Sequence, residues 1–187
     1  MDMSNLFRSM AKNCFPKAQI IADKYHVYRQ VQWAFEDVRK QEQKKFATSR
    51  RHYFKRSRTL LLKGQENLSE EEFEQVSQML SVSKALAQAY YLLHEFRNIM
   101  KSKTKEEAKS KLSAWYMHVG VTELNRFKKC VNTFVDWNEE ILNAFETGLT
   151  NGYTEGCNNR IKVLKRNAYG VRNFDRFRKR ILHVMNR

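Results

Sequence analysis

A helical repeat of apolar residues runs through the middle of the chain and constrains its fold more than any other feature. The first repeat, within residues 26–46, consists of Val27, Val31, Ala34, Phe35 and Val38. These three- and four-residue steps place the side chains on one face of an α-helix, which Trp33 is expected to join. Similar spacing over 83–101 and 124–145 predicts two more long helices. With one proline and six glycines in 187 residues, the chain favours long helices over a β-rich fold.

The charge balance indicates the kind of partner. There are 35 Lys and Arg residues against 20 Asp and Glu, so the net charge is +15. This excess favours a polyanion, with nucleic acid as the first candidate. No run is apolar enough to span a bilayer, and the N-terminus lacks the order of a signal peptide, so we expect a cytoplasmic protein without a membrane partner.

The cysteines and the hydrophobic content exclude other classes of protein. Hydrophobic residues make up 42% of the chain, enough for a core, so wholesale disorder is not expected. The three cysteines are odd in number and far apart. They form neither a zinc pattern nor a disulfide framework, and free thiols in a reducing compartment are the simpler interpretation.

One carboxylate opens a basic helical pattern near the C-terminus. Gly148, Asn151 and Gly152 indicate a break, after which Asn151 or Thr154 could cap a new helix. Residues that would share one face of this helix are Glu155, Asn158 or Asn159, Lys162, and Lys165 or Arg166. The opposite face, with Ile161, Val163 and Leu164, is expected to pack inward. Such groups suit a phosphodiester-cutting site, but a solvated basic face with one incidental acid has the same spacing.

A second acid follows a short apolar run near the N-terminus. Residues 18–22, A-Q-I-I-A, predict a buried strand that ends at Asp23, before a helix opens. Ligands often bind beyond the carboxyl ends of strands in α/β sheets, which makes Asp23 a functional candidate. Capping of the following helix explains the same residue equally well.

A basic run over 50–63 and a final helix provide further cations. Tyr53 or Phe54 in the run could stack on an exposed base or belong to the core. The final helix, with Asn173 as its cap, is expected to bury Phe174, Phe177, Ile181 and Leu182 and to turn its arginines outward. Arg172 and Arg176 are therefore candidate phosphate contacts, although a plain solvated face is as common.

The run T-N-G-Y-T-E-G-C-N-N-R-I-K-V-L-K-R-N-A-Y-G-V-R-N-F-D-R-F-R resembles the C-terminal signature of insertion-sequence transposases of the ISL-three family. The order acid, helix, F-P-K-A, apolar strand, D-K-Y-H resembles the middle of the same proteins. The resemblance implies a DDE active site in which Asp2 is the second catalytic aspartate and Glu155 the third acid. Both would bind Mg²⁺ (or Mn²⁺), while Asp23 and His26 would support the site.

The resemblance also implies an architecture. The fold would be mainly α, with a partial ribonuclease-H-like α/β core and a large all-helical insertion. Residues 1–25 would be a remnant of that core, 26–147 the insertion, and 148–187 the core helices that carry the catalytic glutamate. The DNA-binding residues would be Asn158, Asn159, Lys162, Lys165, Arg166, Arg172 and Arg176.

One departure from the family pattern concerns the residues before Asp2. In the family a strand precedes this aspartate, and the first catalytic aspartate lies further upstream, whereas here Asp2 follows Met1. We therefore expect a truncated transposase, inactive alone, whose metal binds only if the site is completed. Its partners would be the DNA of transposon ends and a homo-oligomer or a complementing N-terminal fragment. The alternatives are a non-catalytic, basic helical DNA-binding protein and a helical interaction module.

Overall fold

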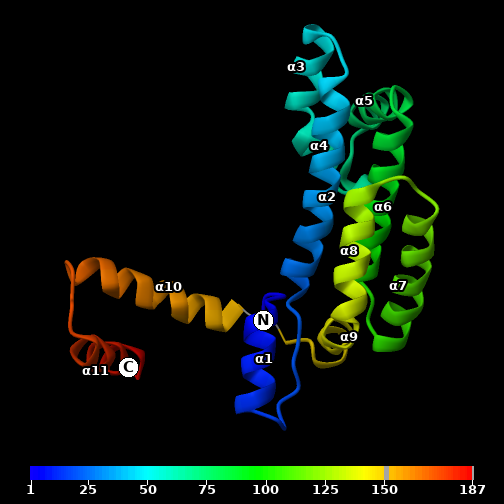
Figure 1. Cartoon of the computed structure of the whole chain (residues 1–187). Helices are drawn as coiled ribbons and strands as arrows, with labels where there is room; N and C mark the ends of the chain where they lie inside the picture. Colours follow the sequence, from blue (N-terminus) through cyan, green and yellow to red (C-terminus); the bar gives the residue numbers. More distant parts are fainter. Residues whose placement is uncertain (150–151, 187) are drawn as a thin grey trace. The chain divides into compact units, whose positions relative to one another are not determined.

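Helices make up both units into which the chain divides. The computed structural model describes residues 1–149 and 152–186, and the units span Met1–Gly148 and Leu149–Arg187 (Figure 1). No strand occurs among the described residues. The prediction of a mainly α fold is thus confirmed, whereas the ribonuclease-H-like α/β core stays a prediction.

The helices of the first unit follow one another with short connections. They are α1 (Asn5–Cys14), α2 (Lys24–Lys44), α3 (Thr48–Arg56), α4 (Arg58–Leu62), the 3₁₀ turn η1 (Gln65–Asn67), α5 (Glu70–Ser81), α6 (Lys84–Met100), α7 (Lys105–Gly120), α8 (Asn125–Asp136) and α9 (Asn138–Thr147). The second unit contains α10 (Gly152–Asn167) and α11 (Phe174–Met185). Across these helices, the described residues offer none with the length and apolar character that crossing a bilayer requires.

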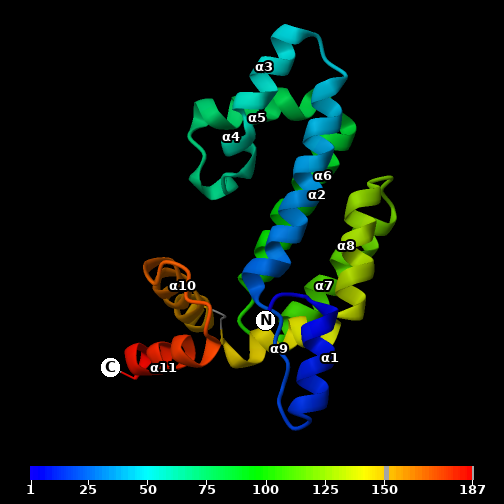
Figure 2. The same cartoon turned by 60° about the vertical axis from the view of Figure 1, so that its left-hand side comes forward.

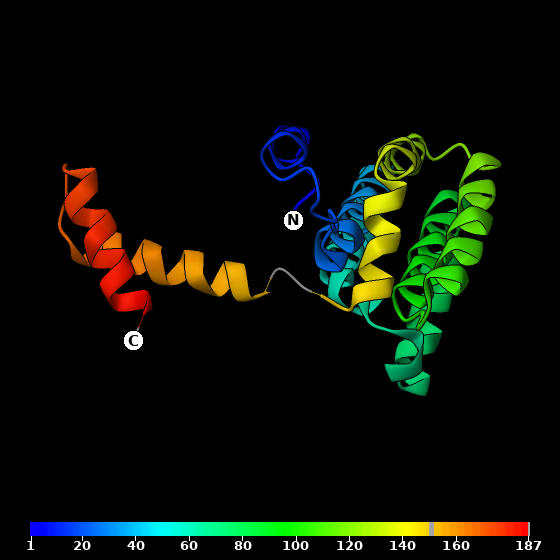
Figure 3. The same ribbon diagram turned by 90° about the horizontal axis from the view of Figure 1, so that it is seen from below.

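Helix α2 is the central element of the first unit. Its apolar repeat faces α6 and α8, and α7 packs against both of those helices (Figures 1 and 3). The predicted residues Val27, Val31 and Phe35 are fully buried there. Helices α3, α4 and α5 gather at the end of α2 that lies away from α1 (Figure 2).

An aromatic cluster joins α6, α7 and α8. The ring of Trp115 lies 4.8 Å from that of Phe96 and 6.3 Å from that of Phe127, centroid to centroid, and Phe134 also contacts it. The indole N–H donates to the carbonyl of Leu92 at 2.9 Å, so the one polar atom of this buried ring is satisfied. Burying each phenylalanine side chain contributes about 1.5–3 kcal/mol to the stability of the unit.

Two predicted elements differ in the structure. The long helix expected over 124–145 is two helices, because the backbone leaves helical geometry at Trp137, between α8 and α9. The strand expected over 18–22 is an extended segment. Its polar groups bond mainly to α9: Ala22 N–H donates to the carbonyl of Glu140, and the carbonyl of Ile20 accepts from the Asn143 amide. A strand requires a neighbouring strand on at least one edge along its length, and on this edge the bonds go to a helix.

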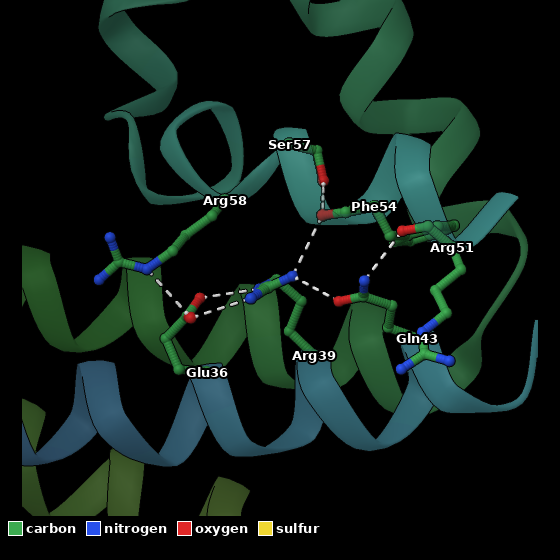
Figure 4. A network of polar contacts seen from close by, with 7 residues as sticks. All are labelled: Glu36, Arg39, Gln43, Arg51, Phe54, Ser57 and Arg58. Atoms are coloured by element: carbon green, nitrogen blue, oxygen red, sulfur yellow. Dashed lines mark hydrogen bonds and ion pairs between the residues drawn. The ribbon is translucent and has the colours of Figure 1, made fainter. Parts of the chain in front are cut away.

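A polar network fastens α3 to α2 (Figure 4). Arg39 donates to both carboxylate oxygens of Glu36, at 2.9 and 3.0 Å, to the Gln43 side chain at 3.0 Å and to the carbonyl of Phe54 at 3.1 Å. Arg58 reaches Glu36 from the other side. Burial by itself would raise the pKa of Glu36, but the bonds and charges of the two arginines outweigh it and lower that pKa. Phe54 is buried, so its ring belongs to the core and is not free to stack on a base.

Replacing Arg39 by methionine should destabilise the first unit by about 3 kcal/mol, because a buried carboxylate then loses its main partner. Urea unfolding followed by circular dichroism measures this loss of free energy. The double variant Glu36→Leu/Arg39→Met removes both charges and should be more stable than the single variant. A double variant less stable than Arg39→Met would contradict this account of the network.

Candidate functional site

The N-terminal residues lie alongside the extended segment that precedes α2. The amino group of Met1 donates to the carbonyl of Ile21 at 2.7 Å, and the N–H of Asp23 donates to the carbonyl of Met1 at 2.9 Å. Met1 thus bonds to both neighbours of Ala22, which is the hydrogen-bond pattern of adjacent parallel strands. Asp2 follows Met1, and Asp23 follows Ala22. The two aspartates therefore lie at the same end of two neighbouring backbone segments.

Asp23 is both the N-cap of α2 and the neighbour of His26. Its buried carboxylate accepts from the N–H of Tyr25 at 2.8 Å, as the capping interpretation predicts. The same oxygen, Oδ1, lies 3.6 Å from His26 Nδ1, one helical turn further on. The structure therefore brings Asp23 and His26 together and places Asp2 on the adjoining segment.

The third predicted acid belongs to the other unit. Glu155 lies in the first turn of α10, where the partial positive charge of a helix N-terminus favours a carboxylate. Asn151 lies outside the described residues, and α10 begins at Gly152, so Thr154 is inside the helix and does not cap it. Glu155 is exposed, as are the other predicted residues of α10: Asn158, Asn159, Lys162, Lys165 and Arg166.

Four of these α10 residues line one shallow hollow of the second unit. Asn159, Lys162, Lys165 and Arg166 border it, together with Val163, Gly170 and Val171. Gly170 has a φ of +90°, which a residue with a side chain adopts only with strain, so it permits the turn that closes the hollow. Arg172, in the same connection, and Arg176, on α11, are exposed. The predicted cations of α10 thus border one hollow, and those of the connection and of α11 are exposed in the same unit.

The apolar faces of α10 and α11 are less covered than predicted. Neither helix has a fully buried residue; Phe174 is 72% exposed, Val163 and Leu182 are also exposed, and Phe177 and Ile181 are half-buried. The prediction that these residues pack inward is therefore wrong for the described unit. In this unit the apolar side of each helix can pack against one other helix. A helix in a protein core is buried by several neighbouring elements. Asn173 does cap α11, accepting from the N–H of Arg176 at 3.0 Å.

The described part of the chain offers few grouped metal ligands. Across residues 1–149 and 152–186 the structure holds no cluster of three or more His, Cys, Asp or Glu side chains that could bind a metal ion. In the first unit, Asp2, Asp23 and His26 are the candidate ligands that the backbone places near one another. These residues do not by themselves fit a metal centre.

An aromatic and cationic ladder on α2 was not predicted from the sequence. Tyr25, Arg29 and Trp33 follow one another at four-residue steps, and the Arg29 guanidinium lies over both rings, 5.4 Å from that of Tyr25 and 4.8 Å from that of Trp33. Trp33 is 59% exposed, so the prediction that it joins the core is wrong. The ladder could have been predicted from the four-residue spacing of these three residues, which lie on the helix face opposite the apolar repeat.

Nearly the whole chain matches the sequence pattern of one protein family. The model of the ISL-three family, described as a transposase, matches residues 1–181. The chain belongs to the ISL-three family of transposases. The match includes both acidic segments, around Asp2 and around Glu155, and the helical span between them.

Two curated proteins resemble this transposase chain over part of their length. The transposase for insertion sequence element IS1001 of Bordetella parapertussis is 27% identical over 183 residues, 95% of this chain and 44% of that protein. A Lactococcus lactis subsp. lactis protein named ATP-dependent protease is 32% identical over 111 residues, 59% of this chain and 34% of that protein. The chain thus spans less than half the length of either relative. No solved structure matches it.

Changing Asp23 should separate its capping role from any role of its charge. Asp23→Ala should lower the free energy of unfolding by about 1 kcal/mol, since alanine cannot accept the Tyr25 N–H, whereas Asp23→Asn should cost only a few tenths because asparagine caps as well. Urea unfolding of the two variants provides the measurement. Equal losses for both would show that the charge, and not the cap, stabilises the start of α2.

Proposed function

We propose that this chain is the C-terminal catalytic part of a DDE-type transposase, which cleaves and transfers DNA strands when an insertion sequence moves. The observation that carries the proposal is the parallel pairing of Met1 with the segment before Asp23. It aligns Asp2 and Asp23 at one end of two backbone segments, the position where sheet-based active sites hold their ligands. The similarity to the IS1001 transposase supports the same function.

The pairing also supports a ribonuclease-H-like sheet in the complete protein. Parallel strands pair through the same pattern that joins Met1 to Ile21 and Asp23. In this proposal residues 18–22 and the residues leading to Asp2 are neighbouring strands of one sheet. Further strands would then extend the sheet on the side of the residues leading to Asp2, because the other edge of residues 18–22 already bonds to α9.

Each predicted site residue has a proposed role in the complete enzyme. Asp2 and Glu155 would hold Mg²⁺ (or Mn²⁺) once a further acidic ligand completes the site, which a homo-oligomer or a complementing N-terminal fragment would supply. When bound there, the ion would supply Lewis-acid stabilisation of the charge that develops on the phosphodiester. Asp23 and His26, already 3.6 Å apart, would position the neighbouring carboxylate, and this chain alone would be inactive.

The DNA-binding surface would be the basic face of the second unit. Its exposed lysines, arginines and asparagines match what phosphate contacts require: cations and amide donors on a helix and a turn. The DNA would be a transposon end. The protease name of the Lactococcus relative is not transferred to this chain, because the match covers about a third of that protein.

A non-catalytic, basic DNA-binding protein is the second candidate function. It is favoured by the lack of a three-ligand metal cluster among the described residues, together with the net charge of +15. Both functions require DNA binding, but only the first depends on Glu155.

The triple variant Lys162→Gln/Lys165→Gln/Arg166→Gln should weaken binding to duplex DNA of any sequence. Each lost phosphate contact should reduce the slope of log affinity against log salt by about one. Fluorescence anisotropy with a labelled duplex, between roughly 50 and 200 mM salt, measures this slope. The matched control Lys103→Gln/Lys109→Gln/Lys128→Gln changes the net charge equally on exposed positions of the first unit. Similar slopes for both triple variants would show that the basic face of α10 is not the binding surface.

A nicking assay distinguishes the two candidate functions. This chain alone with Mg²⁺ or Mn²⁺ should not cut transposon-end DNA, whereas adding the upstream portion of a full-length relative such as the IS1001 transposase should yield cleavage that Glu155→Gln abolishes. Glu155-dependent cleavage by the chain alone would refute its inactivity. A complemented mixture that binds the DNA but does not cut it would favour the non-catalytic function.

A further inference from the structure

The ladder of Tyr25, Arg29 and Trp33 is an organised surface feature. The Arg29 guanidinium lies over both rings, and its Nε is buried without a hydrogen-bond acceptor among the residues that the structure describes. Nor does any described carboxylate form an ion pair with Arg29. The two rings therefore hold the cation through contacts worth roughly 0.5–1 kcal/mol each, and its charge is not cancelled by an acid.

The rings of the ladder are open to solvent although the unit has a core that could bury them. Tyr25 is 61% and Trp33 59% exposed, whereas the other two tryptophans, Trp115 and Trp137, are buried. Single exposed aromatic residues are ordinary on protein surfaces. The ladder is different from a single exposed ring, because one cation holds two rings at regular helical spacing. The rings therefore present a flat apolar surface in a defined orientation.

Cations continue from the ladder along α2 and onto the neighbouring helices. Trp33 borders a groove with Arg126 and Lys129 of α8. A second hollow follows, bordered by Lys40, Lys44 and Arg51 among others, and Arg126 lines both. Asp37, between them, is paired with Arg126. We call the half-buried Arg29 and the exposed residues Tyr25, Trp33, Lys40 and Lys44 the α2 stripe. It runs along a helix about 30 Å long.

The stripe starts beside the candidate site of the first unit. Tyr25 is the residue whose N–H binds the Asp23 carboxylate, and its ring contacts that of His26, with centroids 5.4 Å apart. The order along α2 is therefore acid and histidine, then aromatic rings, then cations. A ligand lying along this helix would meet ring faces near Asp23 and positive charges further away.

We infer that the α2 stripe, together with Lys129 of α8, binds an unpaired DNA strand, with bases stacked on Trp33 and Tyr25 and phosphates held by Lys129, Lys40 and Lys44. This inference rests on the proposed function, since it names the form of DNA that the site would handle. Base–aromatic stacking accepts every base because each has a π-face, and nearby arginine adds to it. The cations neutralise the backbone, as electrostatic binding of a single strand requires.

An unpaired strand fits this surface better than a duplex or a protein. Bases in a duplex are stacked on one another and offer only their edges, so the exposed rings would find no partner. A protein partner would bury the rings, but the lysines and arginines beside them would then need acids. The bases of an unpaired strand have open π-faces, which exposed aromatic rings can stack on.

Tryptophan fluorescence tests the inference directly, because Trp33 is the exposed tryptophan of the chain. The full chain is titrated with an oligothymidylate of about 12 nucleotides and, separately, with a duplex of equal length. The single strand should quench the fluorescence. Trp33→Leu should abolish the quenching and weaken single-strand binding roughly ten-fold or more, while duplex affinity changes less than about two-fold. Trp33→Phe should retain part of the affinity.

Controls separate this inference from the proposed function. Phe73→Leu alters another exposed aromatic residue, on α5, and should leave both affinities unchanged. Equal weakening of single-strand and duplex binding by Trp33→Leu, or no weakening at all, would overturn the inference. So would unchanged DNA binding with an altered oligomeric state in sedimentation, which would identify a protein interface. A wild-type chain that binds no duplex would contradict the proposed function, whatever Trp33 does.

Discussion

Burial of one face of α2 against α6 and α8 is the interaction on which the rest of the first unit depends. Because Val27, Val31 and Phe35 point into the core, the residues a half-turn away must face solvent, and these are Tyr25, Arg29 and Trp33. The same rotation of the helix places Arg39 toward α3, where it bonds to the carbonyl of Phe54. One hydrophobic contact thus orients the core, the polar network and the exposed ladder together.

Asp23 connects this packing with the candidate site. As the N-cap of α2 it marks where the buried helix begins, and through its N–H it holds the carbonyl of Met1. The capping and functional interpretations of this residue are therefore compatible. A carboxylate that is locked by the start of a packed helix is held in one orientation, which a site residue needs.

Local signals in the sequence predicted much of the helical structure. The helix over α2 follows from nearby residues alone, as does the end of α9 at Gly148, whose φ is +64°. The incorrect predictions concern contacts between residues that are far apart in the sequence. The segment 18–22 bonds to α9 and to Met1, the apolar residues of α11 have too few neighbours to be buried, and Trp33 lies on the outer side of its helix. Periodicity cannot reveal which neighbours a segment will meet.

The sequence by itself determined the helical class, the positive charge and the acidic positions at Asp2, Asp23 and Glu155, because these depend on residue type and short-range spacing. Only the tertiary structure decided that Met1 pairs with the segment before Asp23, that Asp23 reaches His26, and that Arg29 joins two exposed rings beside the cations of α8. The reason is physical: a hydrogen bond or a stacked ring requires two groups at a set distance, and between residues far apart in the chain that distance is set by the packing of helices.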